Sequence, residues 1–477
     1  MSAQPSLLDR TLVALTLIIL VALPLPVGSN RTWAIGLFTL LIGAATLLWA
    51  IGQWRGVFKE SRALRPALPM LAMLLLTQLW VAVQWLGGLS MDSGASAQAL
   101  IIGVGYTLLF LLVINLFHTR KRVSLLLGTL VVSGTLQAFY GSFVTLSGFE
   151  GLFGQASSST TGTFINRNSL AGYLGLTLSA GIGLLLALRD NSTFSWVKLV
   201  ELLMGPKARL RLALVIMVIA LVMTHSRGGN ASFFVGLLIV GSVFVLRTKE
   251  NRTRNILILA SVVLIDVLVI SQYFGLERLK DRVMSTQLMD KVVISEVVET
   301  DAISNELIIS DATRSPAPKK PVQHTEVIQK STEIRGDVFL QALPLALDKP
   351  IIGQGAGSFE AVFPQYAGDD IRLHFDLAHN DYIQFAIEYG ALGLVPLVLF
   401  VLMGLSWAFK AIWQQRSLYR GGVGFGAAMG IITMLAHATV DFNLQIPANA
   451  ATFVVLCALA VLAKHHRKDR RKAIEAL

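Results

Sequence analysis

Twelve apolar runs, separated by short polar or charged turns, determine what this chain can fold into. Most of them have about the 20 residues that an α-helix needs to cross a bilayer. We therefore expect an all-α polytopic membrane protein with about 12 transmembrane helices. The runs lie near residues 11–27, 33–51, 69–87, 98–117, 123–147, 168–188, 211–224, 231–246, 254–273, 378–402, 422–440 and 447–463.

The composition excludes the main soluble classes. Hydrophobic residues make up 54% of the 477 residues and charged residues only 14%. This is too little charge to cover a soluble surface, which excludes a cytosolic enzyme and a disordered scaffold. No small-x-small cleavage site follows the first apolar run, so we expect a span there and not a cleavable signal. The single cysteine, Cys457, lies in an apolar run, and we expect it to be a small buried hydrophobe.

The distribution of basic residues predicts the orientation in the membrane. Loops rich in Lys and Arg stay on the cytoplasmic side. The clusters all fall on one side if both termini are cytoplasmic. We expect the basic tail to lie near anionic membrane lipids and not to bind nucleic acid, although the net charge is +11. The clusters are Arg55 to Arg65, Arg120 to Arg122, Arg247 to Arg254 and Lys464 to Lys472.

We divide the chain into five regions. The central helices contain a Ser-Arg-Gly turn, and the long loop contains residues 283–331, a variable insertion of undefined role. Residues 332–377 combine a short amphipathic helix with a glycine-rich turn, Gly353-Gln-Gly355-Ala-Gly357. That turn lacks the Lys-Ser/Thr of a phosphate-binding loop, so we expect it to bring Arg335 back toward the membrane surface. The regions are 1–160, N-terminal transmembrane helices; 161–273, central transmembrane helices; 274–377, a long periplasmic loop; 378–463, C-terminal transmembrane helices; and 464–477, a basic cytoplasmic tail.

Polar groups near membrane depth are costly without a partner or a function, so they are the candidate site residues. Asn166, Arg167 and Asn168 open the run at 168–188, where a helix cap with a snorkelling arginine is the alternative interpretation. Arg227 lies in a tight external turn before two glycines. An arginine held in such a turn is pre-organised to bind an anion through two hydrogen bonds. Arg335 opens the amphipathic segment of the long loop.

The segment that begins at His379 carries the densest polar pattern. On a helix, Asn380, Gln384 and Glu388 would share one face, four residues apart. We expect His379 in the first turn of this helix, as a neutral imidazole that can accept a proton from a hydroxyl. Asp381 and Tyr382 lie within the same stretch and are further candidates for substrate binding.

A His/Asp pair and a lone aspartate also need an explanation. His437 and Asp441 are four residues apart at the external end of the run at 422–440, where a hydrogen-bonded cap is the alternative. Two ligands are too few for a metal, so we expect no metal site. Asp266 is a lone acid in the run at 254–273, and a proton relay is one interpretation of it.

Taken in order, these groups resemble the O-antigen ligase and polymerase superfamily of bacterial envelope glycosyltransferases. The resemblance covers roughly residues 160–460. Two positions depart from the pattern, namely Pro396 and Phe339. The matching elements are His379-Asn380 followed by nine residues and Gly390-x-x-Gly393, the Ser226-Arg227-Gly228 turn, Asn166-x-Asn168, Arg335 before Lys349-Pro350-x-x-Gly353, and Asp441-Phe-x-x-Gln445-x-Pro447.

The resemblance implies a fold similar to type C glycosyltransferases, a location in a bacterial inner membrane and a periplasmic active site. It implies a glycan donor on undecaprenyl diphosphate and an acceptor hydroxyl on lipid A–core, on another glycan or on a protein. The transfer would be inverting, without metal or other cofactor. Arg227 and Arg335 would stabilise the leaving diphosphate, with Arg167 as a weaker third, and His379 would accept the proton. The remaining expected substrate contacts are Asn166, Asn168, Asn380, Asp381, Tyr382, Gln384, Glu388 and Asp441.

Other functional classes also fit twelve spans. One is a transporter or flippase for polysaccharide or lipid-linked oligosaccharide, and another is a non-catalytic assembly subunit. Transporters place their sites near the midplane between repeated halves, whereas the polar groups here cluster at one face. Among the enzymes, a ligase, a polymerase and a protein O-oligosaccharyltransferase would share these residues. The glycosyltransferase interpretation requires Arg227, Arg335 and His379 to meet in one pocket at the outer leaflet.

Overall fold

The computed structural model describes residues 6–149, 151, 159–188, 206–247, 256, 259–260, 331–366, 375–414 and 417–467. In this part of the chain the regular elements are helices, as expected, and no β-strand occurs. The long helices are α1 (Leu7–Ala22), α2 (Thr32–Trp54), α3 (Leu64–Leu86), α4 (Ser93–Leu116), α5 (Arg120–Ser147), α6 (Arg167–Ala187), α8 (Pro206–Met223), α9 (Arg227–Arg247), α12 (Ser331–Asp348), α14 (Asp381–Trp413), α15 (Leu418–His437) and α16 (Pro447–His465). Short helical turns are η1 (Val27–Ser29), α13 (Phe359–Val362), η2 (Phe363–Gln365) and η3 (Asn443–Gln445).

Eleven of the twelve apolar runs coincide with these helices, and nine described helices are long and apolar enough to span a membrane. The other two of the eleven fall short for simple reasons. Helix α1 has only 16 residues, and α8 starts with a stretch that carries three basic side chains. The twelfth run, near 254–273, and Asp266 within it lie outside the described residues apart from a few positions. The described part of the chain is thus all-α, consistent with a multi-pass membrane protein.

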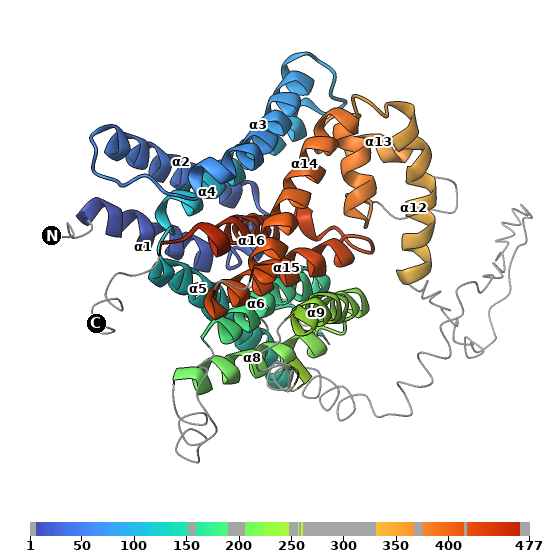
Figure 1. The fold of residues 1–477 in the computed structure, drawn as a ribbon. Coiled ribbons are helices and arrows are strands. Elements are labelled where there is room, and N and C mark those ends of the chain that lie inside the picture. Colours follow the sequence, from blue (N-terminus) through green and yellow to red (C-terminus); the bar gives the residue numbers. More distant parts are fainter. Residues whose placement is uncertain are drawn as a thin grey trace, which may run out of the picture.

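Three helices form the centre of the bundle (Figure 1). The apolar stretch of α6 is wholly buried, and those of α15 and α16 are buried over most of their length. Helices α2, α3 and α4 lie on one side of this centre, and α8 and α9 on the other. Glycines permit the closest approach, because Gly183 of α6 lies directly against Gly426 of α15. Cys457 of α16 is fully buried, as expected.

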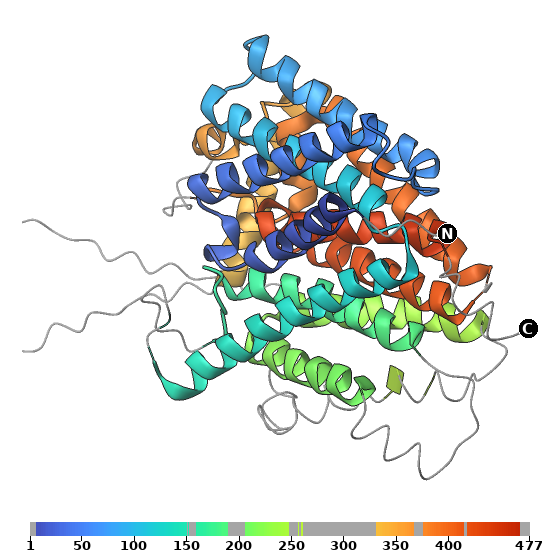
Figure 2. The ribbon, with the colours of Figure 1, turned by 90° about the vertical axis from the view of Figure 1, so that its left-hand side faces the viewer.

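The two ends of the bundle differ in character. At one end, a contact between Asp9 and Arg122 joins the start of α1 to the start of α5. There the backbone of Arg467, after α16, pairs with His118, which precedes α5, and with Arg120, the first residue of α5. The described basic residues Arg120, Arg122 and Arg467 thus lie at this end. The cavity described below lies at the other end, where the turn between α1 and α2 meets the starts of α6, α14 and α16 (Figure 2).

The amphipathic helix expected in the long loop is present as α12. Its buried face packs with α13 and the start of α14 around Val338, Ala342 and Phe359. The glycine-rich turn that follows α12 lies between the α3–α4 turn and α14, since the backbone N–H of Met91 donates to the carbonyl of Gln354. The described part of the long loop is therefore fixed to the bundle and not separate from it.

Candidate functional site

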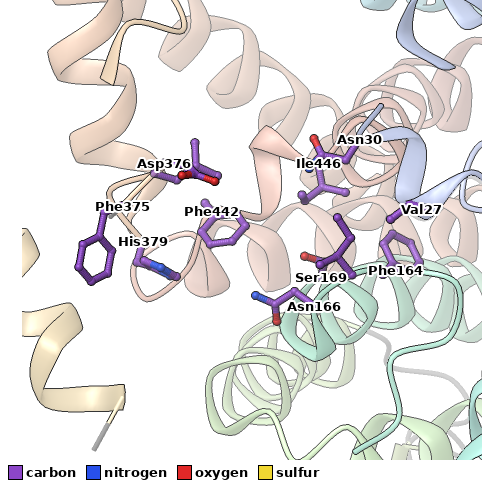
Figure 3. A pocket seen from close by; sticks show the side chains of 12 residues that line it. Val27, Asn30, Phe164, Asn166, Ser169, Phe375, Asp376, His379, Phe442 and Ile446 are labelled. Carbon is purple, nitrogen blue, oxygen red and sulfur yellow. The ribbon is translucent and has the colours of Figure 1, made fainter. Parts of the chain in front are cut away.

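A cavity of about 320 Å³ lies where four distant parts of the chain meet (Figure 3). One wall comes from the α1–α2 turn, one from the start of α6, one from the segment before α14, and one from the α15–α16 turn. Aromatic rings alternate with amide, carboxyl and imidazole groups around it. The lining residues are Val27, Asn30, Phe164, Ile165, Asn166, Ser169, Phe375, Asp376, Leu377, His379, Phe442 and Ile446.

His379 lines this cavity in an unusual backbone conformation. Its φ is +52°, in the left-handed region that few residues other than glycine and asparagine adopt. It lies before α14, so its expected place in the first turn of the helix is wrong. Asn380 caps α14 with its side-chain oxygen and donates from its amide to the carbonyl of Thr439, 2.9 Å away. Because the cap fixes where the helix begins, the chain must turn sharply at His379.

The imidazole of His379 packs against the α15–α16 turn. Its Nδ1 lies 3.7 Å from Oδ1 of Asp441, and its ring packs edge-on against Phe442 at 4.7 Å between centroids. Both side chains are largely buried. Helix α15 ends at His437, so His437 and Asp441 do not form the helical pair that their spacing predicts. The chain turns between them, and Asp441 faces His379 instead.

The wall from the α1–α2 turn is one that sequence analysis missed. Val27, Gly28 and Ser29 all have φ near +60°, and this is rare for a β-branched residue such as valine. The Ser29 hydroxyl donates to the carbonyl of Leu23 at 2.6 Å, and Gly28 packs on the Phe164 ring with no space for a side chain. Asn30 comes directly after this turn in the sequence, and its side chain lines the cavity. Three successive residues in the left-handed conformation produce no periodic sequence pattern. Within this turn, Gly28 is the residue whose type indicates such a conformation.

The predicted Asn166, Arg167 and Asn168 group lies at the start of α6, beside the α1–α2 turn, and Asn166 is its member on the cavity wall. Asn166 caps α6 by accepting from the backbone N–H of Asn168 at 2.8 Å, as the alternative interpretation predicts, and it also lines the cavity. Asn168 is buried, whereas Arg167 is exposed at the same end of the helix. Substrate binding by these three residues stays a prediction.

The turn that carries Arg227 packs against the same end of the bundle. Arg227 is exposed and begins α9. The next two residues are glycines because nothing larger fits: a Cβ on Gly228 would lie 2.7 Å from Val440, and one on Gly229 would lie 2.5 Å from Ala171. These contacts place the Arg227 backbone beside the α15–α16 turn, which packs against His379. The Arg227 side chain does not line the cavity.

Arg335 lies in the first part of α12. Its side chain lies outside the described part of the structure. The structure therefore brings His379, Asn166 and Asp441 together. The meeting of Arg227 and Arg335 with His379 in one pocket stays a prediction.

The polar residues that follow His379 have protein partners. The carboxyl of Asp381 accepts from the Leu444 backbone and the Gln445 amide, and the Tyr382 hydroxyl donates to the Leu435 carbonyl. Gln384 and Glu388 are hydrogen-bonded to each other at 2.6 Å, which confirms their predicted spacing on one helix face. Asp381, Gln384 and Glu388 are all buried. Direct contact of these residues with a substrate stays a prediction.

The glycine-rich turn packs against helix α14 through backbone hydrogen bonds. Helix α14 is broken at Gly390, whose φ is +56° and ψ is −173°. The backbone N–H groups of Gln354 and Gly355 donate to the carbonyls of Ile387 and Glu388, just before that break. The carbonyl groups left unpaired by the broken helix are thus satisfied by the turn.

Comparison with known protein families gives a finding that fits this arrangement. The family model described as O-antigen ligase matches residues 212–398, from α8 through the first half of α14. The match includes the Arg227 turn, Arg335, His379 and the Gly390 break. No curated protein matches the chain. Residues 212–398 are therefore similar to an O-antigen ligase domain, which supports the resemblance to the O-antigen ligase and polymerase superfamily.

Proposed function

We propose that this protein transfers a glycan from an undecaprenyl-diphosphate-linked donor to an acceptor hydroxyl, in the cavity beside His379. The domain match supports glycosyl transfer of the O-antigen ligase or polymerase type in general. The observation that carries the proposal is the His379 imidazole on the cavity wall, with the Asp441 carboxyl 3.7 Å from its Nδ1.

His379 would act as the general base. A carboxylate beside Nδ1 favours the tautomer that keeps its proton on Nδ1, which leaves the lone pair of Nε2 for the substrate. The acceptor oxygen then forms a bond to the anomeric carbon while its proton passes to Nε2. The bond between that carbon and the diphosphate oxygen breaks on the opposite side, which inverts the anomeric centre.

The leaving diphosphate takes the bonding electrons and gains negative charge. Fixed guanidinium groups stabilise such charge without a metal ion. Arg227 is the first candidate because its turn packs against the turn that holds Asp441. Arg335 and Arg167 are the further candidates. The role of Arg335 depends on its side chain turning toward the cavity.

The cavity lining suits a sugar ring. The rings of Phe375 and Phe442 provide apolar faces, and Asn30, Asn166 and Asp376 provide hydrogen-bonding groups around them. Pockets of this kind combine apolar walls with a few polar groups that fix orientation. The acceptor hydroxyl belongs to lipid A–core, to a growing glycan or to a protein.

The cavity end of the bundle would face the periplasm and the basic end the cytoplasm, in a bacterial inner membrane. The support is the Lys/Arg bias, since Arg120, Arg122 and Arg467 all lie at the end away from the cavity. A polyprenyl donor already on the outer leaflet would then reach the cavity without being moved across the membrane.

The decisive experiment uses the full chain in proteoliposomes. We would add a lipid-linked glycan and an acceptor, and measure both glycan transfer and the release of free undecaprenyl diphosphate. The proposal expects both products from the wild type and neither from His379→Asn. A flippase would move the lipid between leaflets without releasing diphosphate, and an assembly subunit would do neither. Either of these results from the wild type would overturn the proposal.

A further inference from the structure

A buried chain of hydrogen bonds connects the glycine-rich segment to the residue before His379. The backbone N–H groups of Gly357 and Phe359 donate to the Glu388 carboxyl. The Gln384 amide donates to Oε1 of Glu388 at 2.6 Å, and its own oxygen accepts from the backbone N–H of Ala378 at 2.7 Å. Gln384 is 1% exposed and Glu388 is 2% exposed, so water does not compete for these bonds.

The chain has a fixed direction because backbone N–H groups stand at both of its ends. At one end, Ala378 can only donate, so Gln384 must accept with its oxygen and donate with its nitrogen. At the other end, Glu388 meets three donors and must be an acceptor throughout. An amide at position 384 and a carboxyl at 388 satisfy this order, whereas an amide at both positions would set two donors against each other.

His379 is the residue that this chain holds in place. Its left-handed φ of +52° persists only where the surroundings fix the backbone on both sides. On the C-terminal side, the backbone N–H of Asp381 donates to the carbonyl of Ala438 at 2.9 Å. On the N-terminal side, the bond from Ala378 to Gln384 supplies the matching anchor. Loss of that anchor would let the turn relax and move the imidazole.

We infer that Gln384 and Glu388 are positioning residues for His379, and that they couple the placement of the glycine-rich segment 353–359 to the imidazole. The inference rests on the proposed function in so far as His379 is the general base. It assigns the two side chains a role other than sugar binding. It also gives the described end of the long loop a direct effect on the reacting group, because that loop supplies Gly357 and Phe359.

The test exchanges the two side chains. In Glu388→Gln, the new amide NH2 must face another hydrogen-bond donor. We expect kcat to fall by about tenfold or more while KM stays within about twofold of the wild-type value, because the catalytic group is misplaced. The double variant Gln384→Glu with Glu388→Gln restores the order: the new carboxyl accepts from Ala378 and from the new amide, whose oxygen accepts from the loop. We expect it to recover kcat to within about threefold of the wild type.

A second measurement does not depend on activity. Hydrogen–deuterium exchange of the peptide covering residues 375–381 reports whether the Ala378 N–H remains bonded. Exchange should be faster in Glu388→Gln and return to the wild-type rate in the double variant. Asp9→Asn is the matched control, because it also replaces a buried carboxyl with an amide, at the opposite end of the bundle against Arg122. It should leave kcat and this peptide's exchange unchanged.

The outcomes separate the two proposals. Unchanged kcat in Glu388→Gln, or a double variant that regains neither rate nor protection, would overturn the positioning role. An equal loss of kcat in Asp9→Asn would also overturn the positioning role, because the loss would then reflect a general decrease in protein stability. If the wild type releases no diphosphate, the proposed function fails. The hydrogen–deuterium exchange measurement alone then decides whether Gln384 and Glu388 fix the backbone turn at His379.

Discussion

His379 combines a strained backbone with the one imidazole on the cavity wall. Left-handed φ costs about 1–2 kcal/mol for a residue with a Cβ, and less for asparagine, whose short side chain bonds locally. Such strain is typical of positions kept for function and not for folding. The effect of the backbone strain and the effect of the imidazole can therefore be separated by the choice of substitution at position 379.

We expect His379→Asn to fold at least as well as the wild type, because asparagine tolerates the left-handed region, and to lose transfer. His379→Val should also lose transfer but fold less well, because a β-branched side chain is strongly disfavoured there. Thermal unfolding of the purified proteins, followed by the diphosphate-release assay, checks both parts. Equal stability of the two variants would show that the turn relaxes without penalty, and retained transfer by either would remove His379 as the base.

At the scale of the elements, glycines decide how closely the helices approach the site. Gly229, in the first turn of α9, faces Ala171 of α6 with no space for a methyl group. We expect Gly229→Ala to cost about 1–3 kcal/mol through overpacking, and to displace the Arg227 turn and so lower transfer. Gly36→Ala is the matched control, since Gly36 of α2 has open space around it. Loss of transfer at both positions alike would exclude this explanation.

The break in α14 predicts a larger effect on folding. Gly390 adopts a conformation that is essentially restricted to glycine, and a Cβ there would overlap the backbone of Ile351 and Gly353. We expect Gly390→Ala to reduce the yield of folded protein in detergent severely. Gly404→Ala in the same helix meets only ordinary contacts, the nearest at 3.5 Å, and should be tolerated. Size-exclusion profiles of the two variants check this, and a normal Gly390→Ala profile would mean that the break is not needed for folding.

Across the whole molecule, the sequence predicts the helices well because each span carries its own apolar run. Eleven of the runs are helices, and the amphipathic segment is α12. The pattern could not predict the α14 break, because Gly390 there resembles any small residue that packs helices. Nor could it predict that Asn30 and Phe442 line one cavity, since only tertiary packing brings the α1–α2 and α15–α16 turns together.

The last prediction concerns the sidedness of the whole bundle, and the lone cysteine makes it measurable. Cys457 is fully buried, so the wild type should not react with a maleimide. Phe149 is 66% exposed after α5, at the cavity end, and Val57 is 42% exposed in the α2–α3 turn, at the other end. We expect a membrane-impermeant maleimide to label Phe149→Cys from outside sealed right-side-out vesicles, and Val57→Cys only after the vesicles are opened. The reverse labelling would place the cavity in the cytoplasm, where a donor on the outer leaflet cannot reach His379.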